Sequence, residues 1–266
     1  MSEYLQIVLL AIFQGVAEFL PISSSGHLEL LGTVTGVAEE ERFTLSIVLH
    51  AGTLFSMLIF YFREILAVFL KKNWRLIGMV IVGSVPAGIG GIAIKLSGGE
   101  SLFHNLTLVG GCFCITGFLL LFLQKIQKQE IEYMPLVKLP WKSVVFIGFL
   151  QMVAILPGIS RSGATIFAGA KCRLNPEEDA QFSFFLAMAA IGGATLLEIL
   201  SLLKKTETIS QSLGVEHFVV GFLFAAISGY AALTALLKLL KSRKLGYFCI
   251  YMFLVGTLTI IYSIWK

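Results

Sequence analysis

Five side chains with reactive groups lie within ten residues near the start of the chain: Glu18, Ser23, Ser24, Ser25 and His27. A serine hydroxyl is a weak nucleophile until a neighbouring base takes its proton, and a histidine or a glutamate can be that base. We therefore predict catalytic roles for Glu18, for Ser24 and for His27. The alternative for His27 is a purely structural role.

A second polar cluster lies at 160–165, where Arg161 stands between Ser160 and Ser162 and is followed by Thr165. A guanidinium offers paired donors to a phosphate, hydroxyls add further donors, and the start of a short helix adds free N–H groups. We predict that these four residues bind phosphate or pyrophosphate, and that Arg161 is also catalytic. The alternative for Arg161 is a simple ion pair with Glu18 that stabilises the fold.

Gln14 and Glu18 are four residues apart and so lie on one face of a helix. Their two oxygens would suit a hard divalent cation, Mg²⁺ or Ca²⁺, although a polar pair in a helix core has the same spacing. His50 lies in the next apolar run and either reaches this site or bonds a neighbouring helix.

The two clusters are copies of one motif. Residues 14–27 read QGVAEFLPISSSGH and residues 151–164 read QMVAILPGISRSGA, with seven identities in fourteen positions. Pro and Gly break a helix, and such a break is tolerated at membrane depth only where protein or a wet cavity covers it. A second repeat pairs GCFCI at 111–115 with GYFCI at 246–250.

The composition indicates a membrane protein. The chain of 266 residues is 57% apolar and 14% charged, with a mean hydropathy of +0.88 and a net charge of +4, which excludes an ordinary soluble domain and gives no support to nucleic-acid binding. Runs long enough to cross a bilayer are Thr44–Phe62, Leu76–Leu96, Leu108–Leu123, Ala180–Leu203, Phe218–Leu240 and Gly246–Trp265.

We predict an all-α polytopic membrane protein with six transmembrane helices and two re-entrant helix hairpins in an inverted-topology repeat. Residues 1–123 form the first repeat, 124–142 a cytoplasmic linker and 143–266 the second repeat. Because each repeat has three spans, the second is inserted upside down, and the two serine loops should meet near the midplane.

Basic residues predict the orientation. They gather in 63–75, 124–142 and 238–245, which are therefore cytoplasmic, and are sparse in 97–105 and 204–216. Both termini are then outside.

QGVAEFLPISSSGHL at 14–28 and PGISRSGATI at 157–166 resemble the motifs of the bacterial undecaprenyl-pyrophosphate phosphatase family, also called bacitracin-resistance proteins. The resemblance extends over essentially the whole chain. It implies a hydrolase of the bacterial cytoplasmic membrane that converts undecaprenyl diphosphate to the monophosphate carrier for peptidoglycan. It also implies divalent-cation dependence, with Gln14 in place of the first carboxylate of some relatives.

On this interpretation the partner is a polyprenyl diphosphate lipid whose tail lies between the helices. Ser24 attacks the terminal phosphorus, Glu18 or His27 handles the proton, and Ser23 and Ser25 join the second loop in binding substrate. The sequence also allows His27 or a water molecule as the nucleophile. A homodimer is a further possibility that it leaves open.

A different class of function shares this architecture. Broken helices in inverted repeats are typical of transporters, so a lipid flippase or a bifunctional protein is the alternative.

Overall fold

The computed structural model describes residues 3–35, 39–129, 132–204, 214–242 and 244–265, and these are almost entirely helical. The first half contains α1 (Glu3–Phe19), α2 (Ser24–Thr35), α3 (Glu39–Phe60), α4 (Phe62–Leu70), α5 (Trp74–Ser97), the 3₁₀ helix η1 (Gly99–His104) and α6 (Leu106–Gln127). The second contains η2 (Leu136–Lys138), α7 (Trp141–Val153), α8 (Arg161–Lys171), α9 (Pro176–Lys204), α10 (Val215–Ser242) and α11 (Gly246–Trp265). The predicted all-α class is confirmed.

Five described helices, α5, α6, α9, α10 and α11, are long and apolar enough to cross a membrane. A sixth span exists if Leu45–Phe60 and Phe62–Leu70 are counted together, although they are bent by 63° at Tyr61. The bend falls near the end of the span predicted for 44–62. The chain is therefore a polytopic α-helical membrane protein.

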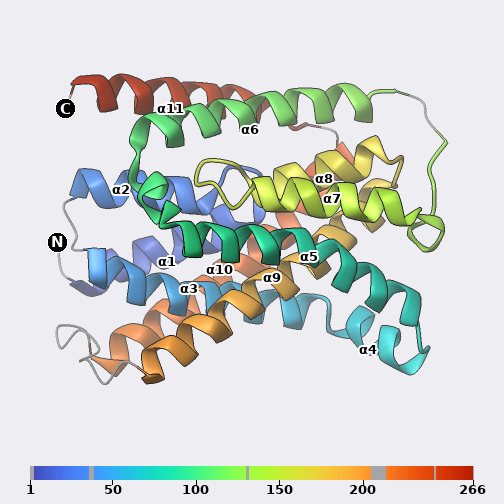
Figure 1. Cartoon of the computed structure of the whole chain (residues 1–266), viewed down its shortest axis with the longest axis horizontal. Helices are drawn as coiled ribbons and strands as arrows, with labels where there is room; N and C mark the ends of the chain where they lie inside the picture. The colour runs from blue at the N-terminus through green and yellow to red at the C-terminus, as the bar shows by residue number, and fades with distance from the viewer. Residues whose placement is uncertain (1–2, 36–38, 130–131, 205–213, 243, 266) are drawn as a thin grey trace.

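The two kinked motifs form hairpins that enter the bundle from opposite ends. Helix α1 runs inward and α2 returns to the end where the chain begins, while α7 and α8 do the same from the other end (Figure 1). The apolar helices Tyr4–Phe19 and Trp141–Val153 are each too short for a full span. This arrangement fits the re-entrant interpretation of both motifs.

Helix packing relates the two halves. Helix α1 packs on α10 as α7 packs on α5, α3 packs on α10 as α5 packs on α9, and the last helices of the halves, α6 and α11, pack on each other (Figure 1). Exchanging the two halves therefore turns each of these contacts into another contact that is also present, as an inverted repeat requires. The boundaries at 123 and 143 stay predictions, since α6 continues to Gln127 and α7 begins at Trp141.

The basic clusters lie at one end of the bundle. Lys71 follows α4 and Lys128 follows α6, at the end opposite both chain termini (Figure 1). Most of the predicted outer connection 204–216, and Arg243 in a predicted cytoplasmic connection, lie outside the described residues.

Candidate active site

The two serine loops contact each other inside the bundle. The Gly158 N–H donates to Ser23 Oγ at 3.0 Å, and a methyl group added to Gly26 would lie 2.7 Å from Gly158 Cα. Ser23 has a left-handed backbone with φ +66°, a strained conformation for a residue other than glycine. The prediction that the loops meet is confirmed.

Each loop ends in a serine that caps a short helix. Ser23 Oγ accepts the Gly26 N–H at 3.4 Å at the start of α2, and Ser160 Oγ accepts the Gly163 N–H at 3.1 Å at the start of α8. Ser23 and Ser160 are equivalent in the repeat. Helices α2 and α8 therefore both begin at the loop contact. The N-terminus of each is the positive end of a dipole, so the arrangement suits an anion.

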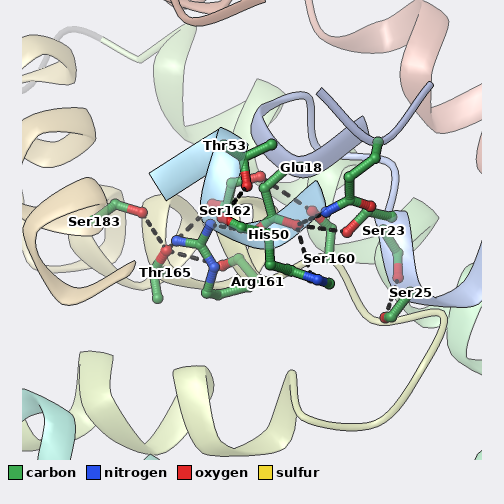
Figure 2. A network of polar contacts seen from close by, with 12 residues as sticks. Glu18, Ser23, Ser25, His50, Thr53, Ser160, Arg161, Ser162, Thr165 and Ser183 are labelled. Carbon is green, nitrogen blue, oxygen red and sulfur yellow. Dashed lines mark hydrogen bonds and ion pairs between the residues drawn. The ribbon is translucent and has the colours of Figure 1, made fainter. Parts of the chain in front are cut away.

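Glu18 binds the first residue of both short helices. Ser24 Oγ donates to Glu18 Oε2 at 2.7 Å. Arg161 Nη2 donates to Glu18 Oε1 at 2.9 Å (Figure 2). Gln14 Nε2 adds a third hydrogen bond to Oε2 at 3.2 Å. Because Glu18 is only 9% exposed, these side chains rather than bulk water hold its charge. A carboxylate bonded to a serine hydroxyl is the pairing of a base with a nucleophile.

Arg161 has a hydrogen-bond donor that Glu18 does not use. Its second terminal nitrogen, Nη1, is buried and has no hydrogen-bond partner among the described residues, while the side chain as a whole is 14% exposed. The ion pair with Glu18 thus leaves half of the guanidinium fork unused. A phosphate oxygen would satisfy Nη1.

The two histidines near the site have different surroundings. His27 Nδ1 lies 2.8 Å from the Ser23 carbonyl oxygen and Nε2 lies 2.8 Å from the Tyr251 hydroxyl, so both ring nitrogens are used away from Glu18. His50 Nε2 instead lies 3.8 Å from Glu18 Oε2 (Figure 2). Of the two open interpretations of His50, the structure supports proximity to the site.

Residues 7–258 match the family model described as "Bacitracin resistance protein BacA". The chain belongs to this family. Proteins named "Undecaprenyl-diphosphatase" are 38% identical in Rhodopirellula baltica over 264 residues, covering 99% of this chain and 100% of the relative, and 40% identical in Carboxydothermus hydrogenoformans over 253 residues, covering 94% of each. The relative of that name in Methanosphaera stadtmanae is 32% identical over 286 residues, covering 99% of each chain.

In this BacA family member the hydroxyls of the second loop are buried and bonded to protein. The Oγ atoms of Ser160 and Ser162 lie 3.2 Å apart, and Ser162 Oγ donates to the Leu20 carbonyl oxygen at 3.4 Å. The hydroxyl of Thr165 forms a hydrogen bond with that of Ser183 in α9 (Figure 2). These contacts hold α8 and, with it, Arg161 in place. Substrate binding by Ser160, Ser162, Thr165, Ser23 and the exposed Ser25 stays a prediction.

The two residues predicted to hold a divalent cation, Gln14 and Glu18, offer oxygen atoms. Gln14 Oε1 is buried without a hydrogen-bond partner in the described part of the chain, beside the Glu18 carboxylate that its own Nε2 binds. An orphaned carbonyl oxygen next to a carboxylate fits Mg²⁺ or Ca²⁺. No group of three His, Cys, Asp or Glu side chains among the described residues is placed to hold a metal, so a diphosphate would have to contribute further ligands.

Sequence reasoning missed three side chains that contact the loops or the short helix that follows: Thr116 of α6, Ser183 of α9 and Tyr251 of α11. For two of them a signal existed, because Thr116 and Tyr251 directly follow the repeated GCFCI and GYFCI segments.

Proposed function

We propose that this chain is an integral-membrane phosphatase that hydrolyses undecaprenyl diphosphate to undecaprenyl phosphate and inorganic phosphate. The observation that carries the proposal is the bonding of Glu18 to both Ser24 and Arg161 at two converging helix N-termini, in a chain of the BacA family. Recycling of the lipid carrier for envelope polymers, and with it bacitracin resistance, follows from this activity.

The chemistry begins with substrate capture. Arg161 Nη1 and the N–H groups at the starts of α2 and α8 bind the diphosphate, whose negative charge competes with Glu18 for the guanidinium. Capture by Arg161 therefore loosens its ion pair with Glu18. The carboxylate then becomes a stronger base toward Ser24.

Ser24 Oγ attacks the terminal phosphorus while Glu18 accepts its proton, and the anhydride P–O bond breaks to release undecaprenyl phosphate. Glu18 passes this proton to the departing undecaprenyl phosphate. It then accepts a proton from a water molecule that attacks the phosphoserine, and it gives that proton to Ser24 Oγ as the bond from serine to phosphorus breaks and inorganic phosphate is released. Gln14 and Glu18 would hold a divalent cation, whose charge offsets that of the diphosphate when bound.

We place the protein in the bacterial cytoplasmic membrane with both termini outside, supported by the basic residues gathered at the end opposite the termini. The polyprenyl tail lies among the apolar helices. A homodimer stays a prediction.

Phosphate release from detergent-purified protein tests the function. We expect release from undecaprenyl diphosphate by the native chain and a loss of more than about 10³-fold in Ser24→Ala, because the nucleophile is gone. Ser84→Ala, a serine of α5 that bonds only its own helix at Val80, is the matched control and should keep full activity. A flippase would release no phosphate. If Ser24→Ala stayed active, the nucleophile would be a water molecule and not Ser24.

A further inference from the structure

Thr116 and Tyr251 occupy equivalent positions in the two halves. GCFCIT at 111–116 corresponds to GYFCIY at 246–251, an offset of 135 residues. Their helices, α6 and α11, pack closely enough that a methyl group added to Gly110 would lie 2.9 Å from the Gly256 carbonyl oxygen. The two side chains therefore project from one helix pair.

Thr116 of the first half holds the loop of the second half. Its hydroxyl donates to the Gly158 carbonyl at 2.8 Å and accepts the Ser160 N–H at 3.0 Å. Gly158 has φ +97°, and Thr116 is fully buried. The threonine thus satisfies two backbone groups that the irregular loop leaves free, directly before Arg161.

Tyr251 of the second half holds the loop of the first half through His27. The Ser23 carbonyl can only accept, so His27 Nδ1 carries the hydrogen, and Nε2 of the neutral ring accepts from the Tyr251 hydroxyl. The two rings stack with centroids 5.6 Å apart and planes 2° apart. His27 thereby fixes the strained Ser23 turn directly before Ser24.

These contacts join into one chain of hydrogen bonds. It runs from Tyr251 to His27, to the Ser23 carbonyl, then from Ser23 Oγ to the Gly158 N–H and from the Gly158 carbonyl to Thr116. Each half thus restrains the loop of the other. Ser24 and Arg161, which both bind Glu18, each directly follow a restrained residue.

We propose that Thr116 and Tyr251 are positioning residues that hold Ser24 and Arg161 on Glu18 at the same time. This assignment rests on the proposed phosphatase function for its kinetic consequence, although the restraint on the loops does not. His27 acts in it as the link between Tyr251 and Ser23.

Kinetics of detergent-purified variants give the first test. Tyr251→Phe keeps the ring and should lower kcat about five- to tenfold with KM nearly unchanged, since one hydrogen bond is lost and no substrate contact. Tyr247→Phe, one turn earlier on α11 and 77% exposed, is its control. Thr116→Val should lower kcat about 100-fold because two backbone groups lose their partner, whereas Thr116→Ser restores activity to within about threefold. Thr259→Val, which loses only a bond to its own helix, is the buried control.

Hydrogen exchange gives the second test and needs no activity. In Tyr251→Phe and in Thr116→Val, peptides covering 20–28 and 155–163 should exchange about fivefold faster than in the native chain, while the controls should not change. Faster exchange in the two variants, together with no phosphate release by the native chain, would reject the phosphatase function and keep the restraint on the loops. Unchanged exchange, unchanged kcat or, in Tyr251→Phe, a rise in KM that accounts for the whole loss would each overturn the positioning role.

Discussion

The two hairpins share a frame but divide the chemistry. Ser23 and Ser160 cap α2 and α8 at equivalent positions, and the next residues, Ser24 and Arg161, both bind Glu18. The carboxylate itself has no counterpart, because Ile155 stands at the position equivalent to Glu18. In the proposed mechanism, this duplicated frame presents a nucleophile and a base from one half and an anion-binding cation from the other.

Gln14 and Gln151, which are equivalent in the repeat, differ in their hydrogen bonds in the same way. Gln14 binds Glu18 one turn later, whereas both amide atoms of Gln151 are buried without a hydrogen-bond partner in the described structure. The residue one turn after Gln151 is the apolar Ile155. Loss of the carboxylate in the second hairpin accounts for the orphaned amide.

The largest expected effect comes from removing the contribution of the second hairpin. Arg161→Ala should lower kcat/KM about 10³-fold, because a preorganised donor to the phosphate is lost and Glu18 keeps an uncompensated charge. Arg161→Lys should lose about 10²-fold, since an ammonium cannot bind Glu18 and phosphate with the same fork. Phosphate release measures both, with Arg75→Lys as a control at an arginine far from the loops, where it binds the Leu139 carbonyl. Near-native turnover in Arg161→Ala would remove the anion-binding role.

Glu18→Gln breaks the contribution of the first hairpin. It keeps size and hydrogen bonding but removes the negative charge that accepts the Ser24 proton, so kcat should fall about 10²-fold. If Glu18 also helps to hold a cation, the Mg²⁺ or Ca²⁺ concentration that gives half-maximal activity should rise in the residual activity. The measurement is phosphate release over a cation titration. An unchanged titration would argue against coordination at Glu18.

Much of this arrangement can be predicted from sequence, because kinked motifs and apolar runs are local patterns. The repeat at 14–27 and 151–164 predicts that Glu18 and Arg161 come together, and their ion pair confirms it. Which side chains contact one another is not set by neighbouring residues in the sequence. Whether His27 or His50 faces Glu18 depends on helix rotation and on Tyr251, which is 224 residues from His27, and the left-handed turn at Ser23 depends on contacts from both halves. The bend at Tyr61 carries no proline or glycine to signal it.

The smallest expected effect separates the two glutamines. A buried amide without hydrogen bonds destabilises a protein by about 1–3 kcal/mol, so Gln151→Leu should raise the thermal midpoint of the detergent-purified protein by a few degrees and leave phosphate release within about twofold. Gln14→Leu is the matched variant at the equivalent position and should lower both stability and activity, because Glu18 loses a hydrogen bond. Thermal denaturation followed by light scattering, together with phosphate release, measures the pair. If Gln151→Leu is less stable than the native chain, a bound water or another polar group satisfies the amide. If it loses as much activity as Gln14→Leu, the second hairpin contributes to the chemistry through more than Arg161, and the division of roles between the hairpins is wrong.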